Sequence, residues 1–150
     1  MHIDERSVTE AVSGIQPGAS EVGWFAARQP GIVRFLEERL LLPDGDAFAV
    51  ALEGAWQIWA VFRRRDGVPP SRVERCLLER AEHALLREAQ SGWSMDDGCA
   101  HRQPALCRWL EAFVANPVVP LTTEESLRVG MALAAVIYSL DELTTGRQVP

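Results

Sequence analysis

The chain has 150 residues, of which 47% are hydrophobic, and a formal net charge of −6 at pH 7. This length and composition predict a single domain over residues 1–150, built around one core. All 15 basic residues are arginine, which codon usage in a GC-rich bacterial genome explains most simply. The lack of lysine excludes a Schiff base, a phosphate-loop lysine, a kinase-type lysine and a Ser–Lys nucleophile pair.

The cysteine count and the apolar segments indicate the compartment. Three cysteines are too few, and odd in number, for a disulfide framework. The N-terminal residues lack the basic and apolar segments of a secretory signal. The longest apolar stretch, residues 129–140, is shorter than the ~20 residues that cross a bilayer. We therefore expect a cytoplasmic protein without membrane contacts.

Helical periodicity dominates the chain and no segment alternates as a strand, which predicts an all-α bundle of about six or seven helices. Three Ser/Thr-x-x-Glu patterns, beginning at Ser7, Ser71 and Thr122, indicate helix starts, because hydroxyl and glutamate can each satisfy a free backbone N–H group. Pro30 and Pro104 suit the first position of a helix. The predicted helices cover residues 5–14, 20–28, 30–42, 46–64, 71–90, 103–115 and 123–144.

A ten-residue motif occurs twice. Residues 28–37 read RQPGIVRFLE and residues 102–111 read RQPALCRWLE, with the Arg, Gln, Pro, Arg, Leu and Glu positions identical. We expect each glutamine to act as a modest N-cap and the arginines to bind carbonyl or carboxylate groups of the other copy. The motif residues are Arg28, Gln29, Pro30 and Arg34 in the first copy, and Arg102, Gln103, Pro104 and Arg108 in the second.

A weaker match follows in the long apolar helices, where Asp46 corresponds to Glu125 and Trp59 to Tyr138. The two matches predict an internal duplication of two similar helical hairpins, related by a pseudo-two-fold axis. Both long helices are apolar nearly all round, so we expect them at the centre of the bundle. Copy one covers about 28–64, copy two about 102–144, and an amphipathic helix at about 71–90 connects them.

Two polar residues, Glu53 and Gln57, lie one turn apart in the otherwise apolar helix predicted at 46–64. A buried carboxylate must pair, form hydrogen bonds or become protonated. The favoured interpretation is an ion pair between Glu53 and an arginine of the repeated motif. The alternative is a ligand cavity, because the second copy has Ala132 and Val136 at the corresponding positions. That cavity would be lined by Glu53, Gln57, Trp56 and Trp59.

No metal or cofactor is expected. A zinc site needs four convergent ligands, and Cys107 takes the place of Val33 in the first copy, which indicates a small apolar core position. The chain also lacks a double C-x-x-C spacing. The weaker alternative is a zinc site formed by His83, Cys99, His101 and Cys107.

Most of the five tryptophans, Trp24 included, are expected in the core, while Trp93 in a predicted loop is the best aromatic candidate for a contact surface. The arginines at 63–65 begin the most basic region, but no nucleic-acid fingerprint accompanies them in this acidic chain. We therefore expect a non-catalytic interaction or scaffold protein with a protein partner or a second copy, and no nucleic acid. A small-molecule-binding protein or enzyme with the Glu53 cavity is the alternative.

Overall fold

A computed structural model describes residues 3–13, 19–40, 46–90, 103–117 and 119–145. In these ranges all regular secondary structure is α-helical, which confirms the predicted all-α class. Each of the seven predicted helices has a counterpart, in the same order, among the helices of the described ranges, and most of their ends agree within two residues. The helices are α1 (Glu5–Ser13), α2 (Ala19–Arg28), α3 (Pro30–Leu40), α4 (Asp46–Asp66), α5 (Arg75–Gln90), α7 (Pro104–Ala115) and α8 (Thr123–Thr145).

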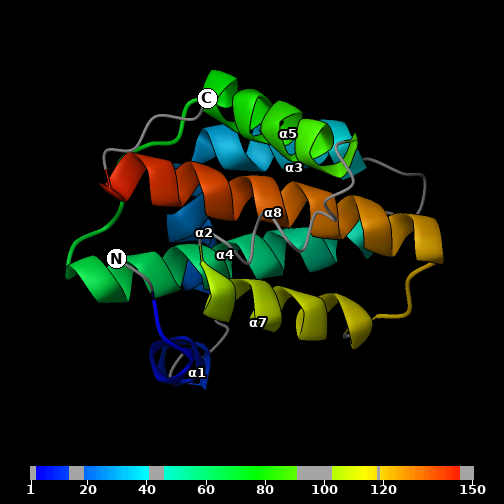
Figure 1. The fold of residues 1–150 in the computed structure, drawn as a ribbon. Coiled ribbons are helices and arrows are strands. Elements are labelled where there is room, and N and C mark those ends of the chain that lie inside the picture. The colour runs from blue at the N-terminus through cyan, green and yellow to red at the C-terminus, as the bar shows by residue number, and fades with distance from the viewer. Residues whose placement is uncertain (1–2, 14–18, 41–45, 91–102, 118, 146–150) are drawn as a thin grey trace.

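The two longest helices form the centre of the bundle. Figure 1 shows α4 and α8 side by side and running in the same direction, with α3 and α5 on one side of the pair and α7 and α1 on the other. Residues 132–142 of α8 are all buried, on every face of the helix. The apolar patterns of both long helices therefore predicted their central position correctly.

The predicted capping pattern is confirmed at the start of α8 but not at the start of α1. At α8 the expected box forms, because Thr122 N donates to Glu125 Oε1 at 2.8 Å and Glu125 N donates to Thr122 Oγ1 at 3.1 Å. At α1 the cap is Asp4 instead, whose Oδ1 accepts from Ser7 N at 2.7 Å. This hydrogen bond also lowers the pKa of Asp4. A carboxylate is a stronger acceptor than a hydroxyl, so Asp4 takes the role predicted for Ser7.

The predicted helix at 71–90 begins later, at Arg75, because a buried glutamine holds the residues before it. The Nε2 of Gln29 donates to the carbonyl oxygens of Pro70 at 3.3 Å and Ser71 at 2.9 Å. Its Oε1 accepts from Val73 N at 2.8 Å. Three bonds to one side chain keep residues 70–73 out of the helix, so the box predicted at Ser71 is wrong.

Thr122→Ala is expected to lower the free energy of unfolding by about 1 kcal/mol, because Glu125 N loses its acceptor at the start of α8. Ser71→Ala is the matched control, since Ser71 is exposed and precedes the helix. We expect it to change stability by less than about 0.5 kcal/mol. Urea unfolding followed by circular dichroism measures both, and equal losses would contradict the assignment.

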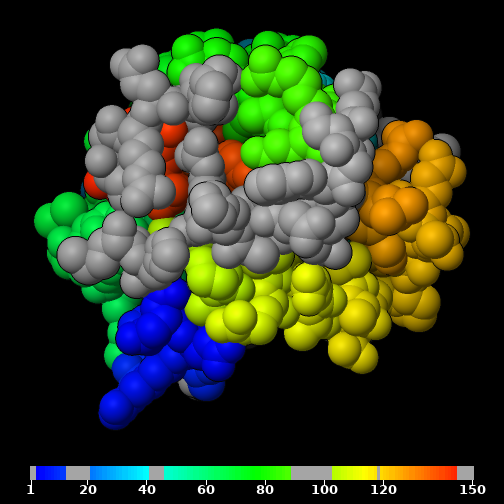
Figure 2. All heavy atoms as spheres, viewed as in Figure 1, coloured from blue at the N-terminus to red at the C-terminus, as the bar shows by residue number. Residues whose placement is uncertain are grey.

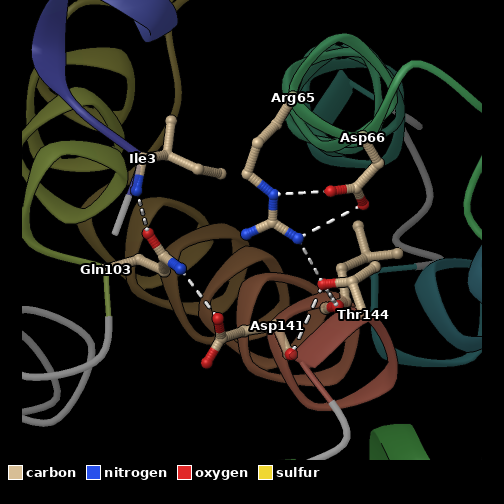
Figure 3. A network of polar contacts seen from close by, with 7 residues as sticks. Ile3, Arg65, Asp66, Gln103, Asp141 and Thr144 are labelled. Atoms are coloured by element: carbon tan, nitrogen blue, oxygen red, sulfur yellow. Dashed lines mark hydrogen bonds and ion pairs between the residues drawn. The ribbon is translucent and has the colours of Figure 1, made fainter. Parts of the chain in front are cut away.

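Gln103, the second glutamine of the repeated motif, binds a segment before a helix, as Gln29 binds the residues before α5 (Figure 3). Its Oε1 accepts from Ile3 N at 2.9 Å, and its Nε2 donates to Asp141 Oδ1 at 2.7 Å. Ile3 lies two residues before α1, as Val73 lies two residues before α5. The Gln103 side chain makes no capping bond at α7. The N-cap prediction was therefore wrong, because both side chains hold distant segments instead.

The two parts of the chain make corresponding helix contacts. Helix α1 packs against α4 and α7, while α5 packs against α8 and α3. Each short helix of the repeated motif, α3 or α7, packs against the long helix that follows it. Helix α1 therefore lies against the long helix of copy one, and α5 lies in the corresponding place against the long helix of copy two. A common origin of the two parts stays a prediction, and these contacts are what it would produce.

Candidate functional site

The four residues of the predicted cavity lie on α4 in two different environments. Trp56 and Trp59 are buried in the main core. Glu53 and Gln57 are half-buried, and Gln57 Nε2 donates to Glu53 Oε1 at 3.4 Å. Surface grooves lie at Trp24 and at the start of α8. None of the four residues lines either groove. Their role in ligand binding stays a prediction.

The expected ion pair between Glu53 and an arginine of the repeated motif is not formed by the described arginines. Arg28 lies on an indole ring, and Arg108 pairs with Glu5. Arg34 is exposed, and Arg102 lies outside the described residues. A half-buried carboxylate keeps part of its hydration, so Glu53 does not require a guanidinium partner.

The zinc alternative is only partly described. His83 is exposed on α5, whereas Cys107 is buried in α7 among core residues. Cys99 and His101 lie outside the described residues, as does Trp93, the aromatic predicted for a contact surface. Within the described part of the chain, no three His, Cys, Asp or Glu side chains are grouped to hold a metal ion. The prediction of no metal site and its weaker zinc alternative both stay untested.

A surface groove lies at Trp24, which was expected in the core but is 38% exposed. Helix α2 packs against α3 and α4 at the outside of the bundle, so part of the indole stays open to solvent. Helix α1 forms another wall and lies at the surface beside the end of α4 (Figure 2). We call this hollow of about 530 Å³ the Trp24 groove, and its lining residues are Ala11, Trp24, Ala60, Arg63, Arg64, Gly67 and Pro69.

Buried aromatic rings fix the position of the Trp24 indole. The Trp24 and Trp59 ring centroids are 5.2 Å apart at an interplanar angle of 76°, an edge-to-face contact. Trp59 also packs against Phe25, with centroids 5.5 Å apart. Trp59, predicted to line a cavity, thus supports the surface indole from below.

Two arginines lie on the Trp24 indole. The Cζ atoms of Arg28 and Arg63 are each 4.9 Å from the Trp24 ring centroid, and Arg63 Cζ is 5.3 Å from that of Trp59. No described carboxylate pairs with either arginine. Most other described arginines do pair with a carboxylate, among them Arg6, Arg39, Arg64, Arg65, Arg75, Arg108 and Arg128.

The end of α4 positions the cations of the groove. Gly67 has φ 74°, a left-handed conformation that glycine adopts without a steric cost, and its N–H donates to Arg63 O at 2.9 Å. The helix therefore stops just after three arginines, at 63–65. Cations in a last helical turn are stabilised by the helix dipole. This turn places Arg63 and Arg64 at the groove.

Arg64, the second arginine that lines the groove, already has an acidic partner. Arg64 Nη2 lies 3.3 Å from Glu10 Oε2 of α1. Arg6 Nε, one turn earlier in α1, lies 2.8 Å from Glu10 Oε1. Glu10 therefore lies between two guanidinium groups at the edge of the groove.

A second groove, of about 440 Å³, lies at the start of α8 and compensates its own charges. Arg39 Nε lies 2.8 Å from Glu82 Oε2, and Arg128 Nη2 lies 2.8 Å from Glu124 Oε1. The hydrogen bond with Glu82 raises the pKa of Arg39. Every charged residue among the described lining residues of this groove therefore has a partner of opposite charge, and none is left to bind a charged ligand. The groove is lined by Arg39, Glu82, Glu124, Leu127, Arg128, Met131 and Ala132.

Comparison with known proteins gives no relative from which a function could be transferred. The chain matches no protein-family model, no curated protein sequence and no solved structure. Among the described helices, none is both long enough and apolar enough to cross a membrane. The candidate site therefore depends on the geometry of the Trp24 groove alone.

Proposed function

We propose that this chain is a non-catalytic interaction protein that binds an acidic segment of a partner protein in the Trp24 groove. The observation that carries the proposal is the position of Arg28 and Arg63. Both guanidinium groups lie on an exposed indole, and neither pairs with a described carboxylate. An acidic segment would supply the missing counter-charges.

The chemistry of the groove favours a protein segment with carboxylates. A guanidinium group binds a carboxylate through two parallel hydrogen bonds, which fixes orientation as well as charge. Tryptophan and arginine are the residue types that contribute most energy to protein interfaces. The chain as a whole has a net charge of −6, so an acidic partner is repelled by most of the surface and directed to this groove.

Site-specific photo-crosslinking tests where the partner binds. A photoreactive residue at Val68, which is 62% exposed beside Gly67 and Pro69, reports on the Trp24 groove. The same residue at Leu127, which is 60% exposed, reports on the second groove and is the matched control. We expect one partner protein to crosslink at position 68 and not at 127, through a peptide rich in Asp or Glu. Crosslinking only at 127, to a second copy of this chain, or through a neutral or basic peptide would contradict the proposal.

Arg63→Ala is expected to weaken the binding of a glutamate-rich synthetic peptide about tenfold, a loss typical of a central arginine at an interface. Arg80→Ala is the control, because Arg80 is exposed on α5, away from the groove, and its loss changes the net charge equally. Fluorescence anisotropy of a labelled peptide measures both affinities, with the glutamine counterpart of the peptide as the neutral reference. Equal losses for the two variants would show non-specific attraction and contradict the assigned groove.

A further inference from the structure

We infer that Glu10 is a built-in competitor of the partner, and that the acidic segment displaces it from Arg64 on binding. The inference rests on the proposed function and concerns the same groove. Arg28 and Arg63 pair with no carboxylate of the described residues and can bind a first carboxylate of the partner. Arg64, which lines the groove together with Arg63, is occupied by the chain's own carboxylate. The segment therefore carries at least two acidic residues.

The Arg64–Glu10 pair has the properties of an exchangeable contact. Both side chains are about half exposed, so water screens their attraction and the pair contributes little to stability. A carboxylate from a bound segment, held nearby by Arg63, would compete for Arg64 at a high effective concentration.

Displacement would not leave Glu10 without a cation. Arg6 lies one turn before Glu10 in α1 and contacts Oε1, whereas Arg64 contacts Oε2. When Arg64 turns to the partner, Glu10 keeps its ion pair with Arg6. The rearrangement thus exchanges one carboxylate for another on Arg64 and leaves neither Arg64 nor Glu10 unpaired.

The affinity of the glutamate-rich peptide for charge-matched variants tests this inference. Glu10→Gln removes the competitor and is expected to tighten binding about two- to fivefold, the effect of one exposed ion pair. Glu79→Gln is the control, because Glu79 pairs with Arg75 within α5 and is 42% exposed, against 44% for Glu10. We expect Glu79→Gln to leave the affinity within experimental error of the original chain.

A second pair of variants separates competition from a change in net charge. In an Arg64→Ala background, Glu10→Gln is expected to have no further effect, because the contested guanidinium is gone. An equal gain with and without Arg64, or equal gains for Glu10→Gln and Glu79→Gln, would overturn the inference. If the peptide binds in an Arg63-dependent way but Glu10→Gln has no effect, only the inference fails. If the peptide does not depend on Arg63, the proposed function fails as well.

Discussion

Gln103→Leu is expected to lower the free energy of unfolding by about 2–4 kcal/mol, clearly more than the loss of the Thr122 cap. The leucine leaves two buried groups without the partners they have in the structure, the backbone N–H of Ile3 and the Oδ1 of Asp141. Asp141 is buried, so the lost hydrogen bond to its carboxylate is not replaced readily by water. Urea unfolding, with the midpoint and slope fitted separately, measures the loss.

A double-mutant cycle tests whether the loss arises from the contact between Gln103 and Asp141. Removing both polar groups, in Gln103→Leu with Asp141→Leu, is expected to cost clearly less than the sum of the two single substitutions, because no carboxylate is then left buried at this contact. Additive losses would contradict a direct role of the hydrogen bond, and the effect of Gln103 would then be one of packing.

Gly31→Ala is expected to lower the free energy of unfolding by about 2–3 kcal/mol, because there is no room for a methyl group at this position. A Cβ atom there would meet the backbone oxygen of Val73 well inside van der Waals contact. Val73 belongs to the segment that Gln29 holds, so neither side of the contact can move without breaking that junction. Thermal and urea unfolding both report the change.

Gly23→Ala is the matched control for Gly31→Ala. A Cβ atom at Gly23 of α2 would have no heavy atom within 4 Å, so the only effect is the higher helix propensity of alanine. We expect this substitution to raise stability by about 0.5–1 kcal/mol. If both substitutions change stability in the same direction, the close approach of α3 to residues 70–73 is not present in solution.

Local sequence patterns were sufficient for the helices and insufficient for segments held by tertiary contacts. The 3.6-residue periodicity of α4 and α8 predicted both helices and their burial, because the pattern follows from each helix alone. At Ser71 a valid capping pattern gave the wrong start, since Gln29, far away in sequence, binds the same backbone. Such competition has no local signal.

The buried Asp141 of α8 also shows that a local pattern does not identify a tertiary hydrogen-bond partner. Asp141 follows Leu133 and Ile137 at a spacing of four, on a face that is otherwise apolar. The sequence therefore held a signal that a carboxylate would be buried there. It did not show that Gln103 would be the hydrogen-bond donor, because that pairing requires the packing of α7 on α8.

The Trp24 groove was only partly accessible to sequence reasoning. Trp24 and Arg28 lie four residues apart, so their contact within α2 follows from helical spacing. The contribution of Arg63, and the contact of Trp24 with Trp59, depend on how α2 packs against α4. Without that packing, the sequence pattern places Trp24 with the core tryptophans and gives no sign of the groove.

Binding of acidic ligands at Trp24 is central to the proposed function, and indole proton NMR tests it most directly. Each of the five tryptophans contributes one indole N–H signal, and the signal of Trp24 is identified by its loss in Trp24→Phe. On titration with the glutamate-rich peptide, the Trp24 signal is predicted to shift in a saturable way, with smaller shifts for the buried Trp56. Saturable shifts confined to other tryptophans, or equal shifts with the glutamine peptide, would contradict binding at Trp24.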